Sequence, residues 1–274
     1  MSFFLKHMAD NLWHGKFGLF PEDIVSHAVS TRMGGVSKAP YSSLNLGLHV
    51  GDSAEDVRRN REIFANSLNF KAEDIVTPEQ VHGTEVLRVT EELKGRGSRD
   101  YGDAIPGTDA LITDVPGIPL LLCFADCTPI LFVDSEHHAI GIAHGGWKGT
   151  VKQIARKTLE AMEREFGTEP EKCLAGIGPS IGPCCYEVGE DVQTACREAF
   201  PEDWQRLLAG QKNGKPHFDL WEANRLQLLQ AGMEASNIDC AAECTCCRHG
   251  WYFSYRADGG TTGRIGAMIG LREY

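Results

Sequence analysis

The sequence predicts a single α/β (α+β) domain built on mixed β-sheets, and three observations lead to this prediction. Strand-like and helix-like segments alternate along the whole chain. Four predicted strands follow one another between residues 109 and 143 without an intervening helix, which a strictly parallel, doubly wound sheet does not allow. The 274 residues can bury a large core, and no long polar tract divides them. We therefore expect one domain over residues 1–274, with helices layered on partly antiparallel sheets.

The predicted strands are short, rich in Val, Ile, Leu or Ala, and bounded by Gly, Pro or Asp. They lie at about residues 25–31, 74–77, 84–89, 109–113, 118–124, 129–134, 139–143, 173–177 and 264–270. Several of them end in turns that carry His, Cys or Asp. The strand ends are therefore where a functional site is expected.

Helices are predicted over residues 53–67, 148–165, 189–199 and 219–231. The second of these is the clearest, because Ile154, Leu159 and Met162 recur at helical spacing while basic residues occupy the other face. Ser53 and Asp219 stand where the first and last helices begin, and both are good N-cap residues. Helices thus separate some of the strands and not others, in keeping with a mixed sheet.

The composition excludes several classes of partner. The formal net charge is −11, and no run of basic residues forms the positive field that nucleic acids or membrane surfaces require. Lys6 and His7 break the apolar start of the chain, and no segment approaches the roughly 18 apolar residues that span a bilayer. We expect a cytoplasmic protein that binds neither nucleic acid nor membrane. The sequence leaves the oligomeric state open.

Three potential metal ligands stand at the ends of predicted strands: His82, Cys127 and His144. Two imidazoles and one thiolate suit zinc or another borderline metal, and three protein ligands leave a fourth position open for water or substrate. Each residue alone has an ordinary alternative role, as a surface histidine, a buried thiol or a turn cap. The hypothesis of a Zn²⁺ site, with Cu²⁺ as the alternative metal, therefore depends on whether the three converge.

Polar groups beside these residues indicate what such a site could bind. Asp126 ends a buried strand, where a carboxylate is costly to bury and therefore indicates a function. It could orient a ligand, hold a substrate hydroxyl or act as a base. After His144, a diglycine leads into a predicted helix whose first N–H groups can bind an anion, and Lys148 adds charge. The alternative is that the glycines only allow a tight turn.

Candidate substrate-binding residues are arginines and amides placed near turns. Arg32 leads into a glycine turn, Asn45 lies in a second turn, and Arg61 lies on the next predicted helix. Gln80 precedes the first histidine, and Arg256 lies in a polar glycine-containing loop before the last strand. Such groups suit phosphate, ribose or purine edges. For the arginines of the helix, an exposed helix face is the alternative, and the last loop could simply turn the chain.

The ten cysteines, in a chain without an export signal, are expected to be thiols or metal ligands rather than a disulfide framework. Cys244 and Cys247 form one C-x-x-C pair near Cys240, but no second pair at zinc-finger spacing follows. The vicinal Cys184 and Cys185 could join them only through folding. The simpler interpretation is that Cys184 and Cys185 lie in a turn beside a proline or are sensitive to oxidation. The sequence therefore does not favour a second zinc site.

These residues together resemble the YfiH-like family, also called the laccase-domain or multicopper polyphenol oxidase family, whose members are described as purine nucleoside phosphorylases. The resemblance extends from about Ser30 to Leu271. It is carried by Ser30-Thr31-Arg32, Gly34-Gly35-Val36-Ser37, Leu44-Asn45-Leu46-Gly47, Gln80-Val81-His82-Gly83, Ala125-Asp126-Cys127-Thr128-Pro129, Ala143-His144-Gly145-Gly146-Trp147, Gly176-Ile177-Gly178-Pro179 with Ile181, and Tyr186-Glu187-Val188.

The resemblance implies a metal held by His82, Cys127 and His144 and a purine nucleoside substrate. Family members are similar in cleaving adenosine, inosine or methylthioadenosine with phosphate, and in deaminating adenosine. The implied fold is a four-layer α/β/β/α arrangement like that of cytotoxic necrotizing factor. The chain departs from the family in its last loop, where Ala257 replaces an arginine before Asp-Gly and Arg256 precedes it.

Other functions can be weighed against the residues. Laccase chemistry needs several His-x-His pairs for a trinuclear copper cluster, and the chain has none, which leaves only weak copper-dependent oxidation. The zinc deaminase signature is absent too, so any deamination would use another arrangement. A Cys–His hydrolase with Cys127 as nucleophile, acting on a cell-wall peptide precursor, is the main alternative. A metal-dependent binding or editing module is the third.

Overall fold

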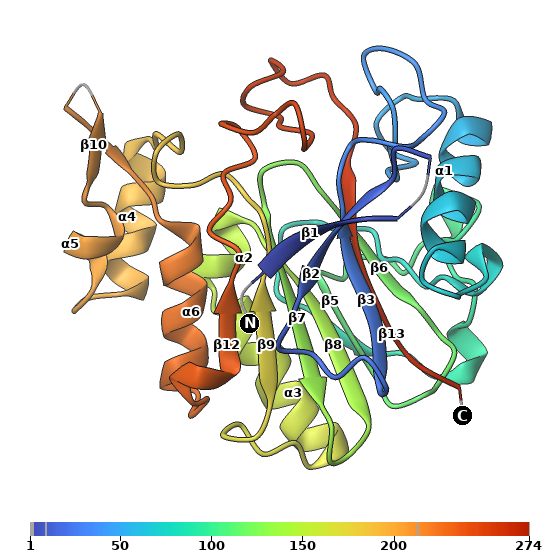
Figure 1. The fold of residues 1–274 in the computed structure, drawn as a ribbon. Helices are drawn as coiled ribbons and strands as arrows, with labels where there is room; N and C mark the ends of the chain where they lie inside the picture. Colours follow the sequence, from blue (N-terminus) through green and yellow to red (C-terminus); the bar gives the residue numbers. More distant parts are fainter. Residues whose placement is uncertain (1–2, 9, 213, 274) are drawn as a thin grey trace.

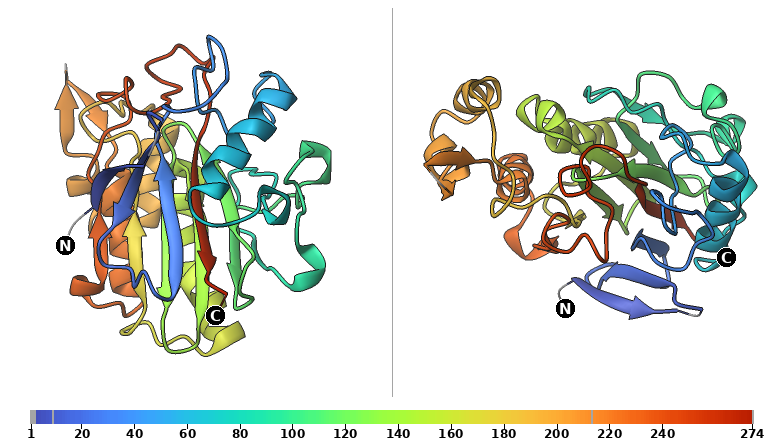
Figure 2. Two further views of the ribbon diagram at one scale, coloured as in Figure 1. Left: turned by 45° about the vertical axis from the view of Figure 1, so that its right-hand side comes forward. Right: turned by 90° about the horizontal axis from the view of Figure 1, so that it is seen from above.

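Two β-sheets stacked face to face form the centre of the molecule, and helices cover both outer faces (Figure 1). The structure, a computed structural model, describes residues 3–8, 10–212 and 214–273. Views from the side and from above show the same order of layers (Figure 2). The four-layer α/β/β/α fold expected from the sequence is therefore confirmed.

The first sheet is antiparallel throughout, with the strand order β1-β2-β3-β13-β6. Its strands are β1 (Phe3–His7), β2 (Trp13–Phe17), β3 (Val25–Ser30), β13 (Ile265–Leu271) and β6 (Leu120–Phe124). The second sheet is mixed and has the order β12-β9-β7-β8-β5-β4, with parallel pairs at its two edges. Its strands are β12 (Ile238–Cys240), β9 (Leu174–Ile177), β7 (Thr128–Asp134), β8 (Ala139–Gly145), β5 (Ala110–Thr113) and β4 (Val86–Arg88). A separate hairpin joins β10 (Gly210–Lys212) to β11 (Lys215–His217).

Apolar side chains fill three successive interfaces between these layers. Leu122 of the first sheet and Leu131 of the second belong to the core between the sheets. Phe64 of helix α1 (Ala54–Asn66) packs on the outer face of the first sheet. Helices α3 (Ile154–Phe166) and α6 (Leu220–Gln230) cover the second sheet. Burying each large apolar side chain contributes about 1.5–3 kcal/mol, so the two sheets form a firmly packed support for the loops at their edges.

The remaining helices pack together beside the second sheet in a smaller cluster with apolar residues of the 181–188 segment. These helices are α2 (Trp147–Val151), α4 (Glu190–Ala199) and α5 (Trp204–Leu207). No helix among the described residues is long and apolar enough to cross a bilayer.

Two predicted elements were wrong in detail. Residues 74–77 form no strand; Val76 makes a single β-bridge to Leu120. The predicted helix over 148–165 is divided into α2 and α3, because Gln153 has a left-handed φ of 68° that interrupts the hydrogen-bond ladder. The anion site expected at the start of one long helix therefore rests on a helix of only five residues.

The N-terminal strands β1 and β2 were not predicted from the sequence. In β2, the polar residues His14 and Lys16 occupy buried positions, and His27 of the neighbouring strand accepts a hydrogen bond from the N–H of Phe17. The five-residue run alternates apolar and polar residues, but its polar residues are buried too, so it lacks the exposed polar face that usually marks such a strand.

Candidate metal centre

Cys127 and His144 are brought together by the pairing of β7 with β8. In this antiparallel pair Thr128 lies opposite Gly145 and Pro129 lies opposite His144, so the first residues of β7 meet the last residues of β8. Cys127 precedes β7 directly, in the turn through which the chain crosses from β6 in the first sheet to the second sheet. The site thus lies where the two sheets are joined.

Asp109 completes this arrangement. It precedes β5, whose first residue pairs with Ala143, and its fully buried carboxylate accepts a hydrogen bond from Nδ1 of His144 at 2.8 Å. The same carboxylate accepts hydrogen bonds from the backbone N–H groups of residues 81, 82 and 83. One carboxylate therefore holds one imidazole and the turn that carries the other, and it leaves Nε2 of His144 free to bind a metal.

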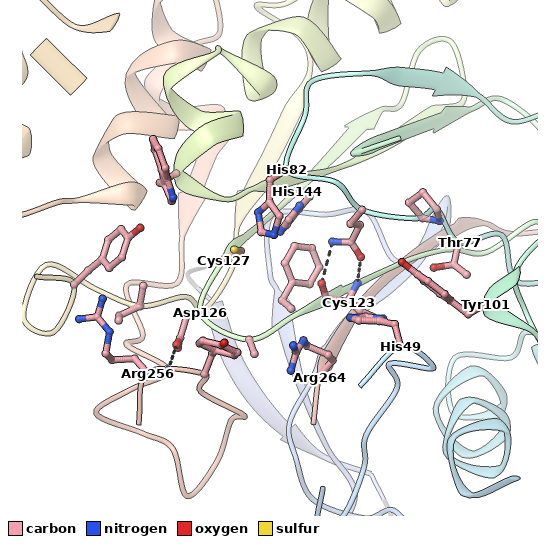
Figure 3. Close-up of a pocket in the computed structure, with 18 of the residues that line it drawn as sticks. His49, Thr77, His82, Tyr101, Cys123, Asp126, Cys127, His144, Arg256 and Arg264 are labelled. Carbon is pink, nitrogen blue, oxygen red and sulfur yellow. Dashed lines mark hydrogen bonds between the residues drawn. The ribbon is translucent and has the colours of Figure 1, made fainter. Parts of the chain in front are cut away.

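The ligand atoms of His82, Cys127 and His144 lie within 4.8 Å of one another. A close-up shows the two imidazoles next to the sulfur, among the residues that line a cavity (Figure 3). The side chains of His82 and Cys127 can come this close to the backbone at residue 146 because it is a glycine. A Cβ atom at Gly146 would stand 2.8 Å from Nδ1 of His82 and 3.1 Å from Sγ of Cys127. His82 itself has a left-handed φ of 60°, a strain that concentrates at functional sites.

Electrostatics favour the metal-binding form of the sulfur. Burial raises the pKa of the Cys127 thiol, but His144 and His82 outweigh this effect and lower that pKa to about 6. Burial lowers the pKa of His144, but the Cys127 thiolate and the Asp109 carboxylate raise it to about 9. These shifts pair a Cys127 thiolate, the form that binds metal ions, with a proton on His144 that a bound metal would displace. Two imidazoles, one thiolate and a carboxylate behind one imidazole fit a zinc-like ion with an open fourth position.

A cavity of about 620 Å³ opens beside the three ligands. This volume lies within the range of small-molecule sites. Its lining includes the aromatic rings of Tyr101, Tyr186 and Tyr255 and the guanidinium groups of Arg256 and Arg264. The cavity therefore combines flat apolar surfaces with positive charge, next to the potential metal ligands.

Three of the five predicted substrate-binding residues line this cavity, but all three use polar atoms to hold the backbone. Gln80 exchanges two hydrogen bonds with the backbone of Cys123, at 2.8 and 3.0 Å. Arg61 is buried and donates to the carbonyl groups of residues 46, 97 and 98. Arg256 donates to the carbonyl groups of Cys185 and Glu187 and lies over the ring of Tyr186.

The structure places the other two predicted residues, Arg32 and Asn45, outside the cavity lining. Arg32 donates to the carbonyl groups of Ser42 and His249. Asn45 is fully buried, donates to the Asp52 carboxylate and accepts from the N–H of residue 264. Both residues order loops behind the cavity. Direct contact of these two side chains with a substrate stays a prediction.

Asp126 links the centre to two other loops. Its backbone has a left-handed φ of 81°, and its carboxylate accepts hydrogen bonds from the Thr245 hydroxyl at 2.6 Å and the Arg256 N–H at 2.7 Å. This carboxylate lines the cavity but is held by both loops. A base or ligand-orienting role for Asp126 stays a prediction beside this observed positioning role.

Four residues at the site, Asp109, Arg264, His49 and Tyr101, were not predicted from the sequence. Asp109 went unnoticed because it begins an apolar strand, although the Thr-Asp pair before that strand was a polar signal. Arg264, His49 and Tyr101 line the cavity from segments far apart in the chain. Of these, only Arg264 belongs to a segment discussed above, the polar loop before the last strand that also carries Arg256.

The chain is similar in sequence to proteins of known name. The purine nucleoside phosphorylase YlmD of Geobacillus stearothermophilus is 44% identical over 249 residues, covering 89% of each chain. The adenosine deaminase RL5 of an unknown prokaryotic organism is 37% identical over 238 residues, covering 86% of this chain and 90% of that protein.

Solved structures show the same fold over almost the full length. The crystal structure of YlmD from Geobacillus stearothermophilus superposes with a TM-score of 0.92 at 41% identity, covering 98% of this chain and 99% of that one. The hypothetical protein YfiH of Bacillus licheniformis gives a TM-score of 0.92 at 35% identity, with the same coverage. The family model described as "Multi-copper polyphenol oxidoreductase laccase" matches residues 26–272. The chain therefore belongs to this laccase-like family and is similar in sequence and structure to the YfiH and YlmD proteins.

Proposed function

We propose that this protein is a metal-dependent purine nucleoside phosphorylase that cleaves adenosine, inosine and methylthioadenosine with phosphate. The observation that carries the proposal is the meeting of His82, Cys127 and His144 at one end of a cavity lined by aromatic rings and arginines. The similarity to relatives named purine nucleoside phosphorylases supports it. We propose Zn²⁺ as the metal and Cu²⁺ as the alternative.

The chain's own residues would bind and orient the reactants. When bound by His82, Cys127 and His144, the metal would supply a Lewis acid with an open coordination position. Arg264 and Arg256 place positive charge on the cavity, which attracts phosphate. The rings of Tyr101 and His49, whose centroids are 5.3 Å apart, offer flat surfaces for a purine. Asp126 keeps the loop of Arg256 against the centre.

Deamination of adenosine is a second candidate, and a specific observation favours it. The relative named adenosine deaminase RL5 is 37% identical over 86% of this chain. An open metal position beside a nucleoside could equally activate water, which attacks the base instead of the sugar. Laccase chemistry is not proposed, because the sequence lacks the His-x-His pairs of a trinuclear copper cluster.

The test is to incubate zinc-loaded protein with adenosine, with and without phosphate, and to separate adenine from inosine by chromatography. A phosphorylase gives adenine and ribose 1-phosphate only when phosphate is present, whereas a deaminase gives inosine in both samples. The His82→Ala variant should lose turnover of inosine while keeping the circular dichroism of the folded protein, because His82 is an exposed ligand. Unchanged turnover in this variant, or no product from the zinc-loaded protein, would contradict the proposal.

A further inference from the structure

A second cluster of potential metal ligands lies outside the centre described above. It consists of four cysteines, Cys184, Cys185, Cys244 and Cys247, whose sulfur atoms all lie within 4.8 Å of one another. The two pairs are about sixty residues apart in the chain, so their spacing gives no sign of the cluster. All four are free thiols in the structure.

The sheet explains why the two pairs meet. Strands β9 and β12 are parallel neighbours, so the segments that follow them leave the sheet at the same edge. The parallel pairing continues beyond the strands, since Ser180 bridges to Cys244 and exchanges backbone hydrogen bonds with residues 243 and 245. This pairing fixes the position of the C-x-x-C turn against the turn that carries Cys184 and Cys185.

The distances fit tetrahedral coordination. Sγ of Cys247 lies 3.5 Å from that of Cys184 and 3.4 Å from that of Cys185. A tetrahedral zinc site with Zn–S bonds of about 2.3 Å has S–S edges of about 3.8 Å. The four sulfur atoms can therefore reach one ion with shifts of a few tenths of an ångström to about one ångström.

Backbone donors already stabilise a thiolate in this cluster. The N–H of Gly182 points at Sγ of Cys244 over 3.3 Å, and the N–H of Cys247 does so over 3.5 Å. Hydrogen bonds of this kind favour the charged form of sulfur, which is the form that a cation requires.

We propose that Cys184, Cys185, Cys244 and Cys247 bind a structural zinc ion that is separate from the His82 centre. The ion displaces the protons of the thiols, and its four positions are then filled by sulfur, so it has no place for substrate. None of the four side chains lines the 620 Å³ cavity. A closed site of this kind ties segments together instead of taking part in a reaction.

The segments tied by this ion form one wall of the cavity. The carbonyl group of Cys185 accepts a hydrogen bond from Arg256, and Tyr186 beside it lines the cavity. On the other segment, the hydroxyl group of Thr245 donates to Asp126. The zinc would therefore hold the loops that position Asp126 and Arg256.

The proposal is tested by counting zinc in reduced, zinc-equilibrated and dialysed protein. The wild type should hold a second zinc equivalent beyond that of the His82 centre, and His82→Ala should retain only this one. X-ray absorption of zinc in His82→Ala should then show four sulfur neighbours. The double variant Cys184→Ser/Cys247→Ser should lose the second equivalent, keep the first, and melt at a temperature about 4–8 °C lower.

Cys246→Ser is the matched control, because Cys246 lies in the same run but outside the group of four; it should keep both equivalents. The proposal is overturned if His82→Ala holds no zinc, or if zinc in that variant has nitrogen neighbours. An intact mass showing a disulfide in protein purified without reductant and exposed to zinc would overturn it as well. Zinc retained at the first centre in the double variant shows that this variant is folded.

Discussion

Two clusters of potential metal ligands lie at loop-bearing edges of one fold, and they differ in what surrounds them. The His82 centre has three ligands of two kinds and faces a cavity. The four-cysteine cluster has ligands of one kind, and none of them lines that cavity. An open coordination position is typical of catalytic zinc, and a full set of sulfur ligands is typical of structural zinc. Under the two proposals above, the first cluster takes part in the reaction and the second stabilises the fold.

The groups behind the ligands differ in the same sense. In the first centre, the Asp109 carboxylate fixes the ring of His144 and raises its basicity. In the second, neutral N–H groups of the backbone point at Sγ of Cys244. Both kinds of partner hold a ligand in place, but only the Asp109 carboxylate adds a charge beside its ligand. Substitutions should therefore affect activity at the first site and stability at the second.

The largest effect is expected for Cys127→Ala. Removing this ligand should lower the turnover of adenosine by on the order of 100-fold or more, because it disrupts the metal on which the proposed reaction depends. The melting temperature should change little compared with that of Cys184→Ser/Cys247→Ser. Steady-state kinetics and thermal melts on both variants check this, and a Cys127→Ala variant that melts early but keeps its turnover would reverse the assignment of the two clusters.

A smaller effect is expected for Asp109→Asn. The amide group no longer holds Nδ1–H of His144 and the ring orientation that presents Nε2 to the metal, so zinc affinity at the first centre should fall about 10–100-fold. Competition with a chelator measures this affinity. Asp114→Asn is the control, since Asp114 is paired with Arg88 away from the centre. An equal loss in both variants would argue against an orienting role for Asp109.

The smallest effect is expected for Thr245→Val, which removes the hydrogen bond that joins the two regions. Thr245 is fully buried and lies between two cysteines of the run, while its hydroxyl group donates to Asp126. Losing one hydrogen bond costs about 1–2 kcal/mol, so KM for adenosine should rise several-fold with both zinc equivalents retained. Kinetics with zinc analysis of the same sample check this. Loss of zinc from the variant would show that Thr245 supports a metal site directly instead of the cavity wall.

The sequence predicted most of the second sheet, because β7, β8 and β5 are buried on both faces and read as continuous apolar runs. It also pointed to Cys127 and His144, which precede or end such runs, and to His82, and the structure brings the potential ligand atoms of all three together. The break at Gln153 could not be predicted, because no glycine or proline marks that position. The roles of Arg32 and Asn45 depend on loop contacts that spacing does not reveal.

The four-cysteine cluster shows most clearly what sequence spacing cannot predict. A zinc finger is recognised by two short pairs at a fixed interval, but here the interval is set by the parallel neighbours β9 and β12. Nothing in the sequence alone says that these two strands are adjacent. Asp109 was missed for a related reason, since its partner His144 lies 35 residues away and across a strand pair.

The passage of the chain from β6 to β7 has a mechanical consequence. Cys127 directly precedes β7, whose pairing with β8 sets the sulfur beside His144 in the second sheet, while the chain before Cys127 comes from β6 in the first sheet. A displacement of one sheet against the other would therefore strain the turn that carries the sulfur, and the apolar core between the sheets, to which Leu122 and Leu131 belong, opposes such a displacement.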